Sequence, residues 1–185
     1  MPVIVEYQKI KREYPEFLSA WEDTRNQAIR AAEEAWGLKF GGFFPAAGEF
    51  GETPIRKPFF NLGTTSGTAE TWNFTLSNTG WQSLIDQTTI EDVYIGLVGW
   101  MFPSTVKRVS AIYVEAGPEK LPVVNIEGEI DLYDEPAVIY ERGLIIPQET
   151  PVKVEVLVNS TGPQIIKPLG FALAKQKLLI SKKPV

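Results

Sequence analysis

The apolar positions between Pro15 and Trp36 recur at helical spacing and predict one amphipathic α-helix. Pro15 suits the first turn of a helix, and Gly37 supplies the left-handed residue that commonly ends one. A face this rich in aromatic side chains has to be buried, either against the rest of the chain or against another subunit. The apolar positions, three and four residues apart, are Phe17, Leu18, Trp21, Ala28, Ile29, Ala32, Ala35 and Trp36.

Residues 37–60 show neither a helical nor a strand period. Glycines and prolines interrupt this stretch, and the aromatic residues Phe43, Phe44 and Phe50 stand between them. Because glycine and proline favour turns and irregular backbone, we expect an extended arm that lies along a protein surface.

Beyond residue 60 the pattern changes to short runs that are typical of β-strands. Residues 70–77 and 151–158 alternate apolar and polar side chains, which predicts strands with one buried face. Residues 92–102 are continuously apolar, as in a strand that is covered on both faces. We expect a further strand in the C-terminal run, residues 170–181. The inward-facing residues of the alternating runs are Trp72, Phe74 and Leu76 in the first, and Val152, Val154, Val156 and Val158 in the second.

Residues 124–133 also alternate and place three acids, Glu127, Glu129 and Asp131, on one side of an expected strand. The simplest interpretation is a hydrated strand face, because unpaired charges are seldom buried. Two alternatives remain open. Hard carboxylate oxygens are suitable ligands for calcium, and acids two residues apart on a strand, about 6.5 Å, have the separation that some glycosidases use.

Seven to nine short strands, separated by glycine and proline, predict a mainly β protein. We expect an antiparallel β-sandwich, jelly-roll-like, preceded by one N-terminal amphipathic helix and an extended arm. The expected division is residues 1–60 for the helix and arm and residues 61–185 for the sandwich domain.

The chain has no histidine and no cysteine. This composition excludes disulfides, thiol nucleophiles, histidine-based triads and typical zinc sites. We therefore expect no enzymatic activity and no cofactor, although catalysis by carboxylates alone remains open. No apolar run is long enough to span a bilayer and no secretory signal is evident, so a virion or cytoplasmic location is expected.

The net charge of −5 disfavours a protein dedicated to nucleic acid. The exception is the C-terminal tail, where Lys175, Lys177, Lys182 and Lys183 occur without an acid. These lysines could contact nucleic acid or a neighbouring copy, but lysines on an edge strand also serve to prevent aggregation.

Among the five tryptophans, Trp81 alone has no clear apolar neighbourhood in the sequence. It follows a predicted turn at residues 77–80, whereas Trp72 and Trp100 fall on expected core positions. An exposed tryptophan is a candidate platform for a carbohydrate ring.

These features favour a non-enzymatic structural subunit that assembles with copies of itself, and with other structural subunits, through the helix and arm. The overall plan is similar to that of subunits of virus particles, such as capsid proteins, in which arms tie copies together. The alternative is a β-sandwich binding module, for example for carbohydrate. The candidate residues for an interface between subunits are Phe17, Trp21, Ile29, Trp36, Phe43, Phe44 and Phe50.

Overall fold

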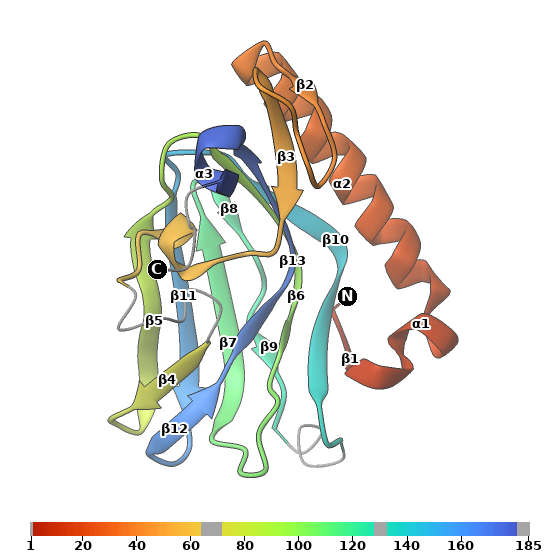
Figure 1. Ribbon diagram of the computed structural model, residues 1–185. Helices are drawn as coiled ribbons and strands as arrows, with labels where there is room; N and C mark the ends of the chain where they lie inside the picture. Colours follow the sequence, from red (N-terminus) through yellow and green to blue (C-terminus); the bar gives the residue numbers. More distant parts are fainter. Residues whose placement is uncertain (1, 64–71, 128–132, 181–185) are drawn as a thin grey trace.

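The computed structural model describes residues 2–63, 72–127 and 133–180 (Figure 1). The predicted helix is confirmed as α2, Pro15–Trp36, with Pro15 in its first turn. It ends at Gly37, whose φ of 63° is left-handed and whose N–H donates to the carbonyl of Glu33 at 2.9 Å. Before it come β1 (Val3–Glu6), the 3-10 turn η1 (Tyr7–Lys9) and the short helix α1 (Ile10–Glu13).

The protein is mainly β, as predicted. Among the described residues the largest sheet has six strands in the order β1-β10-β6-β13-β3-β2, and every pair is antiparallel except β2 with β3. The bounds of the strands added here are β2 (Lys39–Phe40), β3 (Glu49–Thr53), β6 (Val93–Met101), β10 (Pro136–Ile146) and β13 (Lys167–Lys175).

The second sheet has the order β5-β11-β7-β8, with β9 also paired to β7, and a separate pair joins β4 to β12. All of these pairs are antiparallel. Their bounds are β4 (Asn73–Leu76), β5 (Gly80–Thr88), β7 (Val109–Ala116), β8 (Glu119–Lys120), β9 (Val124–Asn125), β11 (Pro151–Val158) and β12 (Gly162–Ile165). The remaining elements are the 3-10 turn η2 (Lys57–Phe60) and the helix α3 (Gln176–Ile180).

The main hydrophobic core draws side chains from both large sheets. Strand β11 contributes its four alternating valines, as predicted, and β6 contributes residues such as Ile95 and Trp100. All nine residues of β6 are buried because its other face lies under α2, where Tyr94 and Val98 join two smaller clusters with the helix. The prediction of a strand covered on both faces is therefore confirmed.

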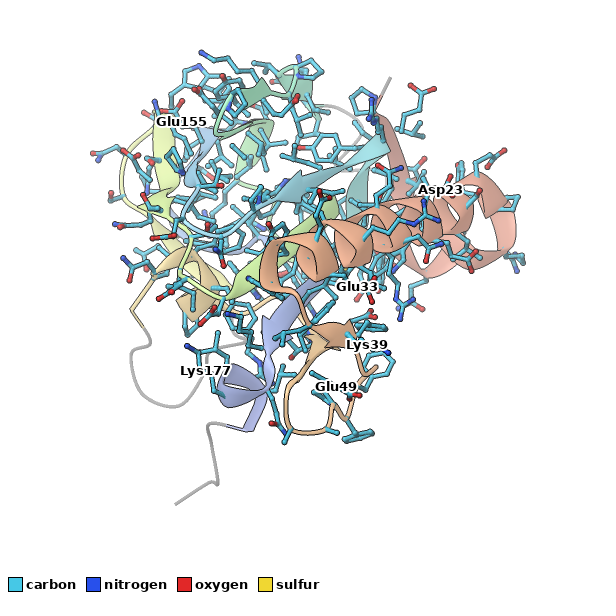
Figure 2. The ribbon with its side chains drawn as sticks, turned by 90° about the horizontal axis from the view of Figure 1, so that it is seen from above. Asp23, Glu33, Lys39, Glu49, Glu155 and Lys177 are labelled. Atoms are coloured by element: carbon cyan, nitrogen blue, oxygen red, sulfur yellow. The ribbon has the colours of Figure 1, made fainter. Side chains whose placement is uncertain are left out.

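Helix α2 packs on the six-stranded sheet of its own chain. Thr24, Ala28 and Ala32 are buried on its inner side. The backbone of β10 passes so close that a Cβ on Gly143 would overlap the Thr24 side chain. Figure 2, viewed from above, shows α2 along one side of the molecule and Glu155 of β11 on the opposite side.

The stretch expected to be an arm is part of the same sheet. Strand β3 pairs with β13 along four residues, from Phe50 opposite Lys175 to Thr53 opposite Ala172. Strand β1 pairs with β10. The expected division at residue 60 therefore does not coincide with a break in the sheet, because strands from both sides of it share hydrogen bonds.

Two other expectations are corrected. The C-terminal run is a strand only as far as Lys175, after which α3 begins, so Lys175 and Lys177 do not lie along one edge strand. In the run 124–133, β9 covers only Val124–Asn125, and residues 128–132 lie outside the described residues.

Candidate functional site

The loop that connects β2 to β3, residues 41–48, presents two adjacent phenylalanines to solvent. Phe43 is 65% exposed and Phe44 is 95% exposed, the largest value for a large apolar side chain among the described residues. Water-exposed aromatic side chains that adjoin one another are characteristic of surfaces that bind a partner. We refer to these two residues as the Phe pair.

Hydrogen bonds at its base give the loop a defined shape. Gly41 N–H donates to the Phe50 carbonyl, and Glu52 N–H donates to the Gly42 carbonyl, each at 2.9 Å. Within the loop, the Ala46 N–H donates to the Glu49 carboxylate at 2.8 Å. The Phe pair is therefore held on a structured turn, which lowers the entropic cost of using it in a contact.

Two glycines make this turn possible. Gly42 has a φ of 78°, which disfavours residues that carry a Cβ. A Cβ on Gly41 would overlap the Glu49 carboxylate. From the other side, the Gln176 side-chain amide of α3 donates to the Pro45 carbonyl at 3.1 Å and attaches the loop to the C-terminal helix.

The other five interface candidates lie against the chain's own sheet. Phe50 is fully buried and Phe17 is 9% exposed. Trp21, Ile29 and Trp36 are partly buried and pack against the clusters beneath α2. In this conformation most of the apolar stripe of the helix is covered within the chain, with Leu18 left 41% exposed. Of the seven candidates, only the Phe pair is exposed.

Two lysines of the expected basic tail bind an acid of their own chain. The Lys175 ammonium lies 2.5 Å from the Asp92 carboxylate, and Lys177 pairs with the other oxygen of the same carboxylate. Lys175 also lies over the Trp36 ring, 5.6 Å from its centre. Figure 2 shows Lys177 projecting from α3. Lys182 and Lys183 lie outside the described residues.

Asp92 is a buried acid with a left-handed backbone conformation. It is 3% exposed, and its φ of 64° is left-handed. Burial by itself raises the pKa of Asp92, but hydrogen bonds and charge from Lys175 and Lys177 outweigh it and leave the pKa below its ordinary value. The same contact raises the pKa of Lys177. The sequence signal was an acid directly before a continuously apolar strand, and its partners 83 and 85 positions further on were not foreseeable.

Of the three acids predicted as a calcium candidate, the structure describes one, Glu127. Glu127 is exposed, and its N–H donates to the Asn125 side chain at 2.9 Å. Glu129 and Asp131 lie outside the described residues, so the calcium interpretation stays a prediction. Within the described part of the chain, no group of three or more acids is placed to hold a metal ion.

A shallow depression of about 620 Å³ lies next to this run, between β1 and the start of β10. Two of its carboxylates have partners: Gln8 donates to the Glu135 carboxylate at 3.0 Å, and the Glu6 carboxylate accepts from the Glu135 N–H at 3.1 Å. The other lining residues are Lys9, Tyr133 and Asp134.

The tryptophans divide as predicted between core and surface. Trp72 and Trp100 are 2% and 1% exposed, whereas Trp81 is 50% exposed. Trp81 is the second residue of β5 and lies opposite Leu157, on the face of the second sheet that points away from the core. On the same outer face, the Tyr113 hydroxyl donates to the Glu115 carboxylate at 3.0 Å, a contact that sequence reasoning did not identify.

Comparison of the chain with protein-family models, with curated proteins and with solved structures found no match. In the part of the chain that the structure describes, no helix is both long enough and apolar enough to cross a membrane.

Proposed function

We propose that this protein is a non-enzymatic structural subunit that assembles with copies of itself, and that the Phe pair is its principal contact. The observation that carries the proposal is the exposure of Phe43 and Phe44 on a hydrogen-bonded turn. A monomer gains nothing from holding two adjacent phenylalanines in water, whereas a subunit gains the free energy of covering them.

We further class the two packed sheets as a jelly-roll-like β-sandwich, an architecture suited to a shell such as a virus particle. The core shared by both sheets supports this class. The proposed interface differs from the one expected from sequence, because α2 and β3 belong to the folded domain, whereas the β2–β3 loop projects from it.

The size of the effect follows from the burial of the two rings. Covering one phenylalanine side chain contributes about 1.5–3 kcal/mol. Removing both would therefore weaken association by about 3–6 kcal/mol, or roughly 100-fold to 10,000-fold in the dissociation constant.

The test is the native mass of the wild type and of the variant Phe43→Ser/Phe44→Ser, measured by sedimentation velocity and light scattering over a wide concentration range. We expect an oligomer for the wild type and a monomer for the variant. Leu18→Ser is the matched control, because Leu18 is 41% exposed and lies near the start of α2, at the end of the helix opposite to the β2–β3 loop (Figure 1). It should leave the mass unchanged.

Both variants should keep the wild-type circular dichroism and melting temperature, since neither changes the core. A wild type that is monomeric at every concentration would remove the proposal. An oligomer that persists in the Phe43→Ser/Phe44→Ser variant would show that other residues hold the subunits together.

A binding module for carbohydrate is the second candidate, and the half-exposed Trp81 favours it. Its indole stands on an outer sheet face that also carries Tyr113, so that a sugar ring could stack on an aromatic side chain beside polar groups. A glycan array that shows binding by the wild type and none by Trp81→Ala would support this alternative. An array without binding would leave self-assembly as the remaining proposal.

A further inference from the structure

The molecule exposes apolar side chains at two opposite ends. In Figure 1 the β2–β3 loop, which carries the Phe pair, lies at the top, and the β4–β5, β6–β7 and β11–β12 connections lie at the bottom. Three exposed apolar residues belong to the elements at this lower end. Trp81 is the second residue of β5, Val106 lies in the β6–β7 connection and Ile165 is the last residue of β12, and they are 50%, 49% and 38% exposed. We call these three residues the Trp81 end. Because the two surfaces lie at opposite ends, one cannot cover the other within a single chain.

The charges around the two surfaces differ in sign. Figure 2 shows Glu33, Lys39 and Glu49 around the base of the β2–β3 loop, which gives two carboxylates and one ammonium group. At the Trp81 end, the Arg108 guanidinium donates to the Thr161 carbonyl at 2.6 Å. Its other partners, the Ser160 hydroxyl and the Pro163 carbonyl, are also uncharged, so they do not neutralise the cation.

These charges distinguish two ways in which copies could meet. Contact between two Phe pairs would bring net negative loop bases together, which like-charge repulsion opposes. Contact between the Phe pair and the Trp81 end would instead bring acidic groups towards Arg108, with aromatic rings covering one another at the centre. The second arrangement satisfies both the apolar and the charged groups.

We propose that the Phe pair of one copy docks on the Trp81 end of the next copy. Such a contact joins two different surfaces and is therefore head-to-tail, so a pair of copies retains one free surface of each kind, one on each subunit. Repetition of this contact produces a ring if the rotation closes and a filament if it does not. This inference rests on the proposed function, because it names the partner surface of the same loop.

The experiment mixes two variants that each lack one surface. Phe43→Ser/Phe44→Ser keeps only the Trp81 end, and Trp81→Ser keeps only the Phe pair. We expect each variant alone to be monomeric where the wild type forms species larger than a dimer. An equimolar mixture should form a 1:1 heterodimer and nothing larger, because only one complementary contact is available.

Ile165→Ser provides a second variant of the same end if Trp81→Ser does not fold, and it should weaken wild-type association at least tenfold. Folding of every variant is checked by circular dichroism and by its melting temperature. The readout is the mass distribution from sedimentation velocity at matched concentrations.

The possible outcomes separate this inference from the proposed function. If Trp81→Ser and Ile165→Ser both assemble like the wild type while the Phe43→Ser/Phe44→Ser variant is monomeric, the Phe pair contacts another surface. The head-to-tail arrangement is then overturned and the proposed function stands. If Phe43→Ser/Phe44→Ser and Trp81→Ser are both folded but stay monomeric in the mixture, the head-to-tail arrangement is also overturned. A wild type that never associates overturns both.

Discussion

Replacement of Asp92 by asparagine tests whether the buried ion pairs hold the C-terminal segment to the sheet. Asp92 stands directly before β6, whereas Lys175 ends β13 and Lys177 belongs to α3. Gln148 adds a further link, since its side-chain oxygen accepts from the Asp92 N–H at 3.0 Å and from the Trp36 indole at 2.9 Å. Asp92 and Gln148 together thus connect four segments that are distant in the sequence, around residues 36, 92, 148 and 175–177.

Asparagine is the suitable replacement because it removes the charge with little other change. Its amide has nearly the same shape as the carboxyl group, and asparagine tolerates the left-handed backbone that residue 92 adopts. Alanine at this position would add a backbone penalty of about 1 kcal/mol or more. Comparison of Asp92→Asn with Asp92→Ala therefore separates the contribution of the charge from that of the backbone.

The expected loss for Asp92→Asn is about 1–3 kcal/mol of unfolding free energy. Hydrogen bonds to charged groups contribute about 1.5–3 kcal/mol each when they are protected from water. Here the Asp92 side chain is 4% exposed, but those of Lys175 and Lys177 are 31% and 66% exposed, so solvent screens part of the attraction. The variant also leaves two ammonium groups beside one another without an intervening carboxylate.

The assay is urea unfolding followed by tryptophan fluorescence, with an unchanged denaturant slope as the sign that the two states are comparable. Glu155→Gln is the matched control, because it makes the same chemical change in a surface pair with Lys153 at 3.1 Å. The control should lie within about 0.5 kcal/mol of the wild type. A loss for Asp92→Asn no larger than that of the control would show that desolvation of the carboxylate cancels its pairing.

Three further expectations concern acid, the helix contact and the loop. The pKa of Asp92 is lower in the folded protein than in the unfolded chain, so its stabilisation is fully present above about pH 4 and is lost as the pH falls through the folded value. In thermal melts, the difference in melting temperature between wild type and Asp92→Asn should therefore shrink in acid. A difference that stays constant down to about pH 2.5 would contradict this. Gly143→Ala should lower the free energy of unfolding in urea by about 1–3 kcal/mol, since the new Cβ would overlap Thr24. Adding Thr24→Ala to this variant should recover part of the loss. If nothing is recovered, the strain lies elsewhere than at Thr24. Phe50→Ala should lose about 3–5 kcal/mol of unfolding free energy and Phe44→Ala less than about 0.5 kcal/mol, although the two positions are only six apart, because Phe50 is fully buried and Phe44 is 95% exposed. Similar losses for the two variants in urea unfolding would refute this difference.

Elements whose signal is local could be predicted from the sequence. Helix α2 has the predicted first and last residues because its apolar period, Pro15 and Gly37 all lie within the element and need no distant partner. The four valines of β11 face the core for the same reason, since side chains of a strand alternate whatever the strand pairs with. The mainly β class follows from the number of such runs.

Tertiary structure alone decided how the sequence-distant residues meet. Strand β3 gave no periodic signal because it is covered on both sides, with Phe50 beneath α2 on one face and Gly51 against Leu179 of α3 and Pro45 on the other. Composition could not distinguish buried Phe50 from the exposed Phe pair, because that difference depends on which backbone pairs with β13. Periodicity reports the neighbours of a residue along the chain, whereas burial and ion pairing depend on contacts that only the folded chain creates.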